Sequence, residues 1–176
     1  MKTLIVIPVR MASTRFPNKP MVLIAGKPMI QRVWEQAVLS KVGDVIVACC
    51  DKEIRNLILN LGGKVEMTDP NLPSGTDRVF SAIKNYGNIN DYDSIINLQG
   101  DMPLINPNDI TRVNFPLRQG FDIGTLATNF TTEEEVQDEN ITKVHIQWIK
   151  NKIIGKAIDF HKDISLLKGD NHYHHV

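Results

Sequence analysis

Apolar residues in the first two thirds of the chain alternate between short continuous runs and positions spaced as on a helix face. The continuous runs are typical of strands buried on both faces of a parallel sheet. They predict strands over residues 4–9, 44–48, 64–68 and 94–98. The helically spaced segments lie between or after these runs. They predict helices over residues 28–40, 52–61, 76–84 and 108–118.

The pattern changes at Asp122. Alternating apolar and polar positions predict strands over residues 123–129, 143–150 and 152–160. The last two form a hairpin joined at Asn151, and residues 172–176 read as the start of one more strand.

The order of these elements predicts an α/β fold. Strands that alternate with helices form a mostly parallel, Rossmann-like sheet with right-handed crossovers, and we expect the first strand to be central. A β-rich excursion follows in the C-terminal third. We find no repeat or linker, so we expect one domain over residues 1–176. Because the chain stops as a strand begins, we expect this domain to be incomplete at its C-terminus.

Charge is distributed unevenly along the chain. The 176 residues carry 20 basic and 20 acidic side chains. The first 34 residues, however, include six basic residues and no acidic one. The remaining 142 residues therefore carry 14 basic and 20 acidic side chains. A local excess of positive charge concentrates anions at that segment. A small polyanion such as a nucleoside triphosphate suits so confined a cluster.

Composition excludes several classes of protein. Aromatic residues make up only 6% of the chain and basic residues form no stripe, so we expect no nucleic-acid partner. No run of about 18 uncharged apolar residues is present, so we expect no membrane span. The N-terminal apolar run is too short for a signal peptide, which predicts a cytoplasmic protein. Cys49 and Cys50 are adjacent, a spacing that suits neither a redox pair nor a zinc site, and we assign them no chemistry.

The loop after the first strand is the first candidate site. It contains Arg10, Arg15 and Lys19 without an acid, at the strand end where open α/β sheets bind ligands. One guanidinium group can bind two phosphate oxygens at once, and lysine adds a point charge. The alternative is a solvated basic loop. No Walker A loop or G-x-G-x-x-G motif is present, so side chains would hold the phosphates.

Two further segments could carry chemistry. Asp101 follows a predicted strand and precedes Met102-Pro103, so its carboxylate could coordinate a magnesium ion that bridges triphosphate oxygens; it could equally be an ordinary turn former. The segment 74–78, SGTDR, begins a helix. Its hydroxyl groups could cap that helix, and a cap can also bind a ligand.

Three segments carry a resemblance to a known family. They are PVRMASTRFPNKPMVLIAGKPMIQRVWE at residues 8–35, SGTDR at 74–78 and NLQGDMP at 97–103. In this order they resemble the nucleotide-sugar cytidylyltransferases, and most closely those that act on 3-deoxy-manno-octulosonate (KDO). The resemblance implies the nucleotide-diphospho-sugar transferase type of fold. It also implies transfer of CMP from CTP to KDO, with release of pyrophosphate and Mg²⁺ as cofactor, for lipopolysaccharide synthesis.

The resemblance further implies roles for individual residues. Arg10 and Lys19 would be catalytic and, with Ser13 and the loop amides, would hold the triphosphate, assisted by Arg15. Asp101 would be catalytic as a magnesium ligand. Other positions would bind substrate: Ser74, Gly75 and Arg78 in the nucleotide and sugar cleft, Gln99 on the sugar acid, and His175. The family also implies a homodimer.

The chain departs from the family pattern at several points. Met102 replaces a family acid, the segment 48–51 is one residue longer, and residues 160–165 lack a family arginine that meets the sugar acid. His172, His174 and His175 could suggest a metal cluster, although a strand explains them as well. Two alternatives stay open: a truncated, inactive remnant that binds CTP only, and a cytidylyltransferase for another sugar acid such as sialic acid.

Overall fold

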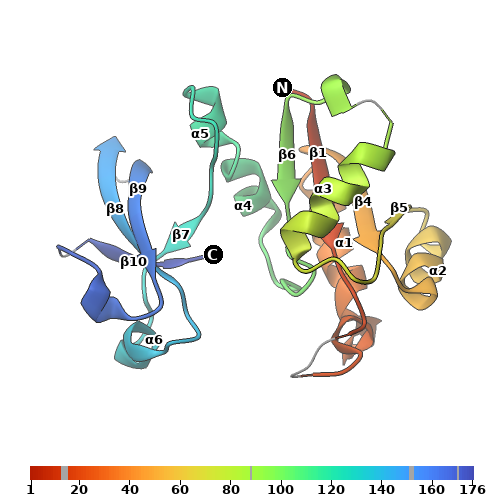
Figure 1. Cartoon of the computed structure of the whole chain (residues 1–176), viewed down its shortest axis with the longest axis horizontal. Coiled ribbons are helices and arrows are strands. Elements are labelled where there is room, and N and C mark those ends of the chain that lie inside the picture. Colours follow the sequence, from red (N-terminus) through yellow and green to blue (C-terminus); the bar gives the residue numbers. More distant parts are fainter. Residues whose placement is uncertain (13–15, 88, 151–152, 170) are drawn as a thin grey trace. The chain divides into compact units, whose positions relative to one another are not determined.

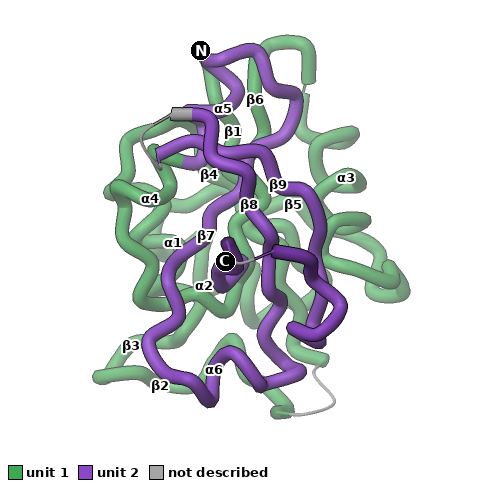
Figure 2. The backbone as a smooth tube through the Cα atoms, turned by 90° about the vertical axis from the view of Figure 1, so that its left-hand side faces the viewer, with its two compact units in different colours: residues 1–112 green, residues 113–176 purple. Residues whose placement is uncertain are grey.

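The chain is divided into two compact units in the computed structural model. The model describes residues 1–12, 16–87, 89–150, 153–169 and 171–176. The first unit covers Met1–Arg112 and the second covers Val113–Val176 (Figure 2). The predicted β-rich excursion corresponds to the second unit, whereas the single domain over residues 1–176 stays a prediction. No helix among the described residues is long and apolar enough to span a membrane.

A parallel four-stranded sheet forms the centre of the first unit. Its strands lie in the order β5-β4-β1-β6. Their bounds are β1 Thr3–Pro8, β4 Gly43–Cys49, β5 Lys64–Met67 and β6 Ser94–Asn97. All four predicted strands are therefore confirmed, with ends shifted by one residue at most on either side.

Strand β1 is the central strand that the sequence predicted. It pairs in parallel with β4 from Thr3 to Pro8 and with β6 from Thr3 to Val6. All six of its residues are buried, because neighbours on both edges and helices on both faces leave no side in water. This explains why its sequence is a continuous apolar run rather than an alternating one.

Helices cover both faces of this sheet (Figures 1 and 2). Helix α3 packs on the face formed by Leu4, Val6, Ile46 and Ala48, and α1 and α2 lie on the other face. The helices of this unit are α1 Met29–Leu39, α2 Lys52–Asn60, α3 Gly75–Asn85 and α4 Pro107–Arg112, with short 3₁₀ turns at Lys19–Met21 and Ile89–Asp91. Between β1 and α1 the chain also forms a small hairpin of β2 Leu23–Ile24 and β3 Lys27–Pro28.

A crevice lies at the carboxyl ends of β1 and β6, where successive strands are added on opposite sides of β1. The chain moves from β1 outward to β4 and β5, and then returns through α3 to β6 on the opposite side of β1. Such a switch point is where open α/β sheets bind ligands. Gly100 permits close approach here, because a Cβ at this position would lie 2.9 Å from the Pro8 carbonyl oxygen.

The predicted helix over residues 108–118 is wrong as a single element. The chain forms α4 up to Arg112 and a separate helix α5, Phe115–Arg118, with Pro116 in its first turn. Proline has no N–H to bond to the preceding turn and disfavours helical geometry in the residue before it. The helical pattern therefore continues while the backbone hydrogen bonds do not.

The second unit is an antiparallel sheet in the order β7-β10-β8-β9. Its elements are β7 Ala127–Thr128, β8 Lys143–Lys150, β9 Ile154–His161, β10 His172–His175, helix α6 Glu133–Gln137 and a 3₁₀ turn at Ile164–Leu166. The predicted hairpin of β8 and β9 and the terminal strand are confirmed, and Asn151 lies outside the described residues. The prediction of a strand over 123–129 is wrong in extent, because only Ala127 and Thr128 find partners on β10.

The core of the second unit contains a lysine. Lys143 is fully buried beside Val144, and its ammonium group donates hydrogen bonds to the carbonyl oxygens of Asp138 at 2.5 Å and Lys162 at 2.6 Å. A buried charge requires such hydrogen bonds. Lys143 therefore ties the segment before β8 to the segment after β9.

The central position of β1 gives a prediction about stability. Ile5 is fully buried on β1, so Ile5→Ala should lower the free energy of unfolding by about 2–5 kcal/mol through lost burial and a cavity. Leu39→Ala, at the 61% exposed end of α1, should change it by about 0.5 kcal/mol. Urea denaturation measures both. Equal losses would contradict the central role of β1.

Candidate functional site

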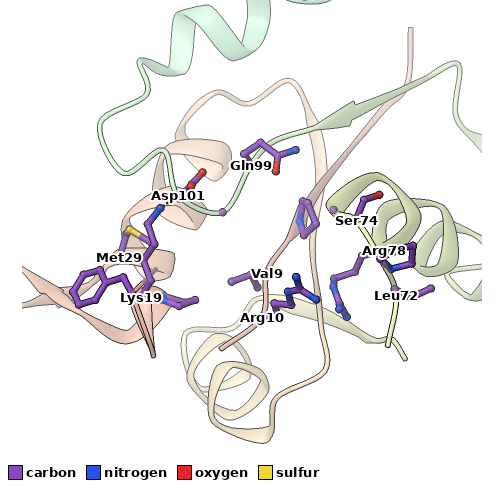
Figure 3. Close-up of a pocket in the computed structure, with 15 residues that line it drawn as sticks. Val9, Arg10, Lys19, Met29, Leu72, Ser74, Arg78, Gln99 and Asp101 are labelled. Carbon is purple, nitrogen blue, oxygen red and sulfur yellow. Dashed lines mark hydrogen bonds and ion pairs between the residues drawn. The ribbon is translucent and has the colours of Figure 1, made fainter. Parts of the chain in front are cut away.

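A pocket of about 670 Å³ lies at the switch point of the first unit. Three segments contribute its walls: the end of β1 with the loop that follows, the start of α3, and the turn after β6 (Figure 3). Most of the residues that the sequence singled out line it, namely Arg10, Lys19, Ser74, Gly75, Arg78, Gln99 and Asp101. Residues far apart in the sequence thus converge on one cavity.

An ion pair joins two of these segments. The ammonium group of Lys19, from the loop after β1, donates a hydrogen bond of 2.7 Å to a carboxylate oxygen of Asp101, from the turn after β6. Both side chains keep access to solvent, with 37% and 52% of their surface exposed. A pair this open contributes little to stability. Its charges are available to a ligand in the pocket.

Arg10 adds a second cation to the pocket. It is the first residue after the last ladder bond of β1, in which the Val9 amide donates to the Ala48 carbonyl oxygen at 2.9 Å. Its side chain is exposed, and it forms no ion pair with any residue described in the structure. In Figure 3 it lies between the Lys19–Asp101 pair and Arg78. Ser13 and Arg15, predicted for the same loop, lie outside the described residues.

Arg78 is a buried cation in the wall of the pocket. Only 2% of its surface is exposed. Its Nη1 group donates a hydrogen bond to the Thr68 hydroxyl, which itself donates to the Cys49 carbonyl oxygen at 3.1 Å. Its Nη2 group is buried and has no hydrogen-bond partner among the described residues. A buried donor without an acceptor is costly, so this group is suited to bind a ligand acceptor.

Ser74 is the N-cap of α3. Its hydroxyl oxygen accepts a hydrogen bond of 3.1 Å from the Asp77 amide and donates to the Asp77 carboxylate. The capping role considered from the sequence is thus present. Gly75 next to it keeps the pocket open, because a Cβ there would lie 3.3 Å from Gln99 Oε1 and 3.4 Å from Pro8 Cγ.

Gln99 lines the pocket from the turn after β6. Its side chain is exposed, and its amide nitrogen donates to Asn97 Oδ1 at 2.9 Å. The amide oxygen faces the start of α3 near Gly75. The side chain therefore presents an amide group to the pocket rather than packing in the core.

His175 belongs to the second unit. Its Nε2 atom lies 2.9 Å from the Thr125 hydroxyl oxygen, and its ring stacks edge-on against Phe160. Burial, followed by the nearby charge of His174, lowers its pKa. Its predicted role in binding substrate stays a prediction. The terminal histidines form strand β10, and the described part of the chain contains no group of three His, Cys, Asp or Glu residues placed to hold a metal.

Sequence reasoning missed several residues of this site. The pocket is also lined by Pro8, Phe16, Leu72 and Met29. Asp51, two residues after β4, accepts a hydrogen bond from the Met11 amide in the basic loop. Asp51 could have been noticed, because it follows a strand in the same way as Asp101. The apolar lining residues have no signal of their own in the sequence.

The two cysteines behave as structural residues. Both are free, and Cys49 is fully buried at the end of β4. Burial raises the pKa of the Cys49 thiol to about 11 and also raises the pKa of Cys50, to which the neighbouring Asp51 carboxylate contributes. Raised pKa values keep both thiols protonated and weakly nucleophilic at neutral pH.

The pocket is suited to a polyanion that brings a cation with it. Arg10 and Lys19 provide positive charge from the loop after β1 and Arg78 from α3, and Asp101 adds one exposed carboxylate to the pocket lining. Magnesium in nucleotide sites is commonly held by one or two carboxylates together with substrate phosphates. The donor set at Asp101 fits that mode, and it does not form a complete metal cage by itself.

The family model and the related sequences point to the same protein family. A sequence model described as cytidylyltransferase matches residues 4–163. The 3-deoxy-manno-octulosonate cytidylyltransferase of Paramagnetospirillum magneticum is 39% identical over 174 residues, which cover 98% of this chain and 71% of the relative. The protein of the same name from Parvibaculum lavamentivorans is 40% identical over 174 residues, covering 98% and 67%.

Solved structures agree with the sequence relatives. A structure of CMP:2-keto-3-deoxy-manno-octonic acid synthetase complexed with CTP superposes with a TM-score of 0.85 at 31% identity, covering all of this chain and 72% of that one. A cytidylyltransferase from Leptospira borgpetersenii superposes with a TM-score of 0.60 at 27% identity, covering 75% and 56%. The predicted α/β fold and the resemblance are confirmed. The chain belongs to the cytidylyltransferase family, and within it to the 3-deoxy-manno-octulosonate cytidylyltransferases.

Proposed function

We propose that this protein transfers CMP from CTP to 3-deoxy-manno-octulosonate and releases pyrophosphate. The observation that carries the proposal is the pocket at the carboxyl ends of β1 and β6, where Arg10, Lys19, Arg78 and Asp101 meet. The likeness to a solved synthetase complexed with CTP, over the whole of this chain, supports it. The sequence relatives carry the same enzyme name at 39% and 40% identity. No observation favours another sugar acid.

In this reaction the anomeric hydroxyl of the sugar acid attacks the α-phosphorus of CTP. A new bond forms between the sugar oxygen and the α-phosphorus, and the hydroxyl proton passes to water. The bond between the α-phosphorus and the oxygen that bridges to the β-phosphate breaks, and pyrophosphate leaves with the electron pair. Catalysis of phosphoryl transfer depends on positioning and on neutralising the charge of the phosphates. The side chains in the pocket are of the types that this task requires.

Arg10 and Lys19 are the proposed triphosphate ligands. Arg10 is exposed in the pocket and its guanidinium can bind two phosphate oxygens at once. Lys19 is held by Asp101 at 2.7 Å, which places its ammonium group before any substrate arrives. Ser13 and Arg15 of the same loop would assist, as the family resemblance implies.

Asp101 is the proposed ligand of Mg²⁺. The ion would enter with the triphosphate, because one carboxylate with substrate oxygens and water is a usual coordination set. Magnesium would supply charge neutralisation at the phosphates when bound. Asp101 itself holds Lys19 through Oδ2, and its side chain, which lines the pocket, is 52% exposed.

The sugar acid is assigned to the remaining polar groups. We propose that Gln99, an exposed residue of the pocket lining, binds it with its side-chain amide. Ser74 and Gly75 would form the adjacent wall, and His175 of the second unit stays a proposed substrate ligand. A homodimer is proposed on the family resemblance alone. The two free cysteines support a cytoplasmic location, because reducing compartments keep thiols unpaired.

Pyrophosphate release tests the proposed reaction directly. The purified chain is incubated with CTP, Mg²⁺ and KDO, and pyrophosphate is measured by a coupled assay. We expect release that requires both substrates. Release with sialic acid in place of KDO would indicate another sugar acid. If calorimetry shows CTP binding but neither mixture releases pyrophosphate, the protein only binds CTP.

Lys19→Met tests the role of the cationic loop. Loss of a preorganised charge that stabilises the transition state typically costs about 100-fold to 1000-fold in turnover. We expect a fall of this size in kcat, together with weaker CTP binding. Lys27→Met is the matched control, because Lys27 belongs to the same basic segment but pairs with Glu35 at 2.9 Å. An equal effect of both changes would mean that only overall charge matters.

Arg78→Met tests the buried cation. It removes the Nη2 donor that lacks an acceptor among the described residues together with the Nη1 hydrogen bond to the Thr68 hydroxyl, so the free protein should lose only about 1 kcal/mol of stability. CTP affinity should fall about tenfold to 100-fold, the loss expected for one hydrogen bond with a charged partner. Calorimetry and thermal melts measure the two quantities. Unchanged affinity with a large fall in melting temperature would show that Arg78 is structural.

A further inference from the structure

Asp51 occupies a helix-capping position without capping its helix. It is the N-cap residue of α2, with extended backbone angles of φ −105° and ψ 130°, yet its side chain accepts no hydrogen bond from the amides of that helix. Ser74 and Thr132 hold the same position on α3 and α6, and both accept such bonds. Aspartate is among the preferred N-cap residues, so a different contact has taken its carboxylate.

That contact is with the basic loop. Oδ2 of Asp51 accepts a hydrogen bond of 2.8 Å from the backbone amide of Met11, forty residues earlier in the chain. The Cys50 thiol donates to the same oxygen at 3.3 Å. Because Asp51 lies two residues after the end of β4, the bond fastens the loop after β1 to the end of the neighbouring strand.

Met11 uses both of its backbone groups to shape this loop. Its amide bonds to Asp51, and its carbonyl oxygen accepts a hydrogen bond of 3.3 Å from the Asn18 amide. Arg10 immediately precedes Met11 and shares a peptide group with it. Lys19 immediately follows Asn18 and begins a 3₁₀ turn. These two hydrogen bonds form a clamp that joins Asp51, Met11 and Asn18. The two cations of the loop, Arg10 and Lys19, are therefore each next to a residue of this clamp.

We propose that Asp51 is a positioning residue that orients Arg10 and Lys19 through the Met11 backbone. The proposal rests on the proposed function for its kinetic effect, whereas the clamp itself rests on hydrogen bonds alone. Without Asp51, the loop samples more conformations and fewer molecules are ready to bind the triphosphate. The apparent affinity for CTP then falls in proportion to the fraction of molecules that remain competent to bind. Turnover at saturating CTP stays the same.

Asp51→Ser separates positioning from stability. Serine is a good N-cap, so α2 and the melting temperature should be maintained, but its short side chain cannot reach the Met11 amide. We expect KM for CTP to rise about tenfold, the size expected for the loss of a hydrogen bond to a charged group, with kcat within about twofold of the wild type. Asp51→Asn keeps a neutral acceptor and should give a smaller rise.

The Met11 and Asn18 amides give a second readout that needs no activity. In Asp51→Ser their hydrogen exchange, followed by NMR, should become faster while amides of β1 and β4 keep their rates. Glu53→Gln is the matched control, because it removes an exposed carboxylate from the first turn of the same helix and should change neither exchange nor KM.

Two results would overturn the proposal. One is unchanged exchange at Met11 in Asp51→Ser, or in Asp51→Asn if the serine variant does not fold. The other is an unchanged KM in an Asp51→Ser protein whose exchange has become faster. If the wild-type chain shows no turnover, the proposed function is wrong. The clamp would still stand if the Met11 and Asn18 amides exchange faster in Asp51→Ser than in the wild type.

Discussion

Parallel pairing of β1 with strands on both of its edges is the constraint on which the first unit depends. Because β4 and β6 both run in the direction of β1, their carboxyl ends lie at one edge of the sheet. The loop with Arg10, the Asp51 corner and the turn with Asp101 therefore meet there. Each comes from a different part of the chain, and none would approach the others without the backbone ladder.

The charge in the pocket follows from this convergence. Three cations line one cavity, and the described residues offer them few acidic partners there: Lys19 has Asp101, Arg78 has only hydroxyl contact through Thr68, and Arg10 has no ion pair. Folding normally pairs or exposes charge, and a buried donor without an acceptor is unfavourable. Such an arrangement is expected where an anionic ligand supplies the missing partners.

The sequence predicted the strands and most helices of the first unit, because burial imposes a characteristic spacing of apolar side chains on each kind of element. Its errors are at particular residues. Pro116 interrupts a helix whose apolar spacing continues past it. The segment around Ala127 has the composition of a strand, but its ladder partner on β10 is available for only two residues. Spacing reports which side faces the core, whereas pairing depends on a distant segment.

By itself, the sequence determined the order of strands and helices, the basic loop and the family to which the chain belongs, because these properties are encoded in local spacing and short motifs. Tertiary structure decided how those parts act together. It placed Lys19 against Asp101, left one nitrogen of Arg78 without a described partner, and turned Asp51 from its own helix towards the Met11 amide. The two contacts, of Lys19 with Asp101 and of Asp51 with Met11, join residues 82 and 40 positions apart in the sequence. Residues so far apart come into contact only when the backbone hydrogen bonds of the sheet bring the strands together.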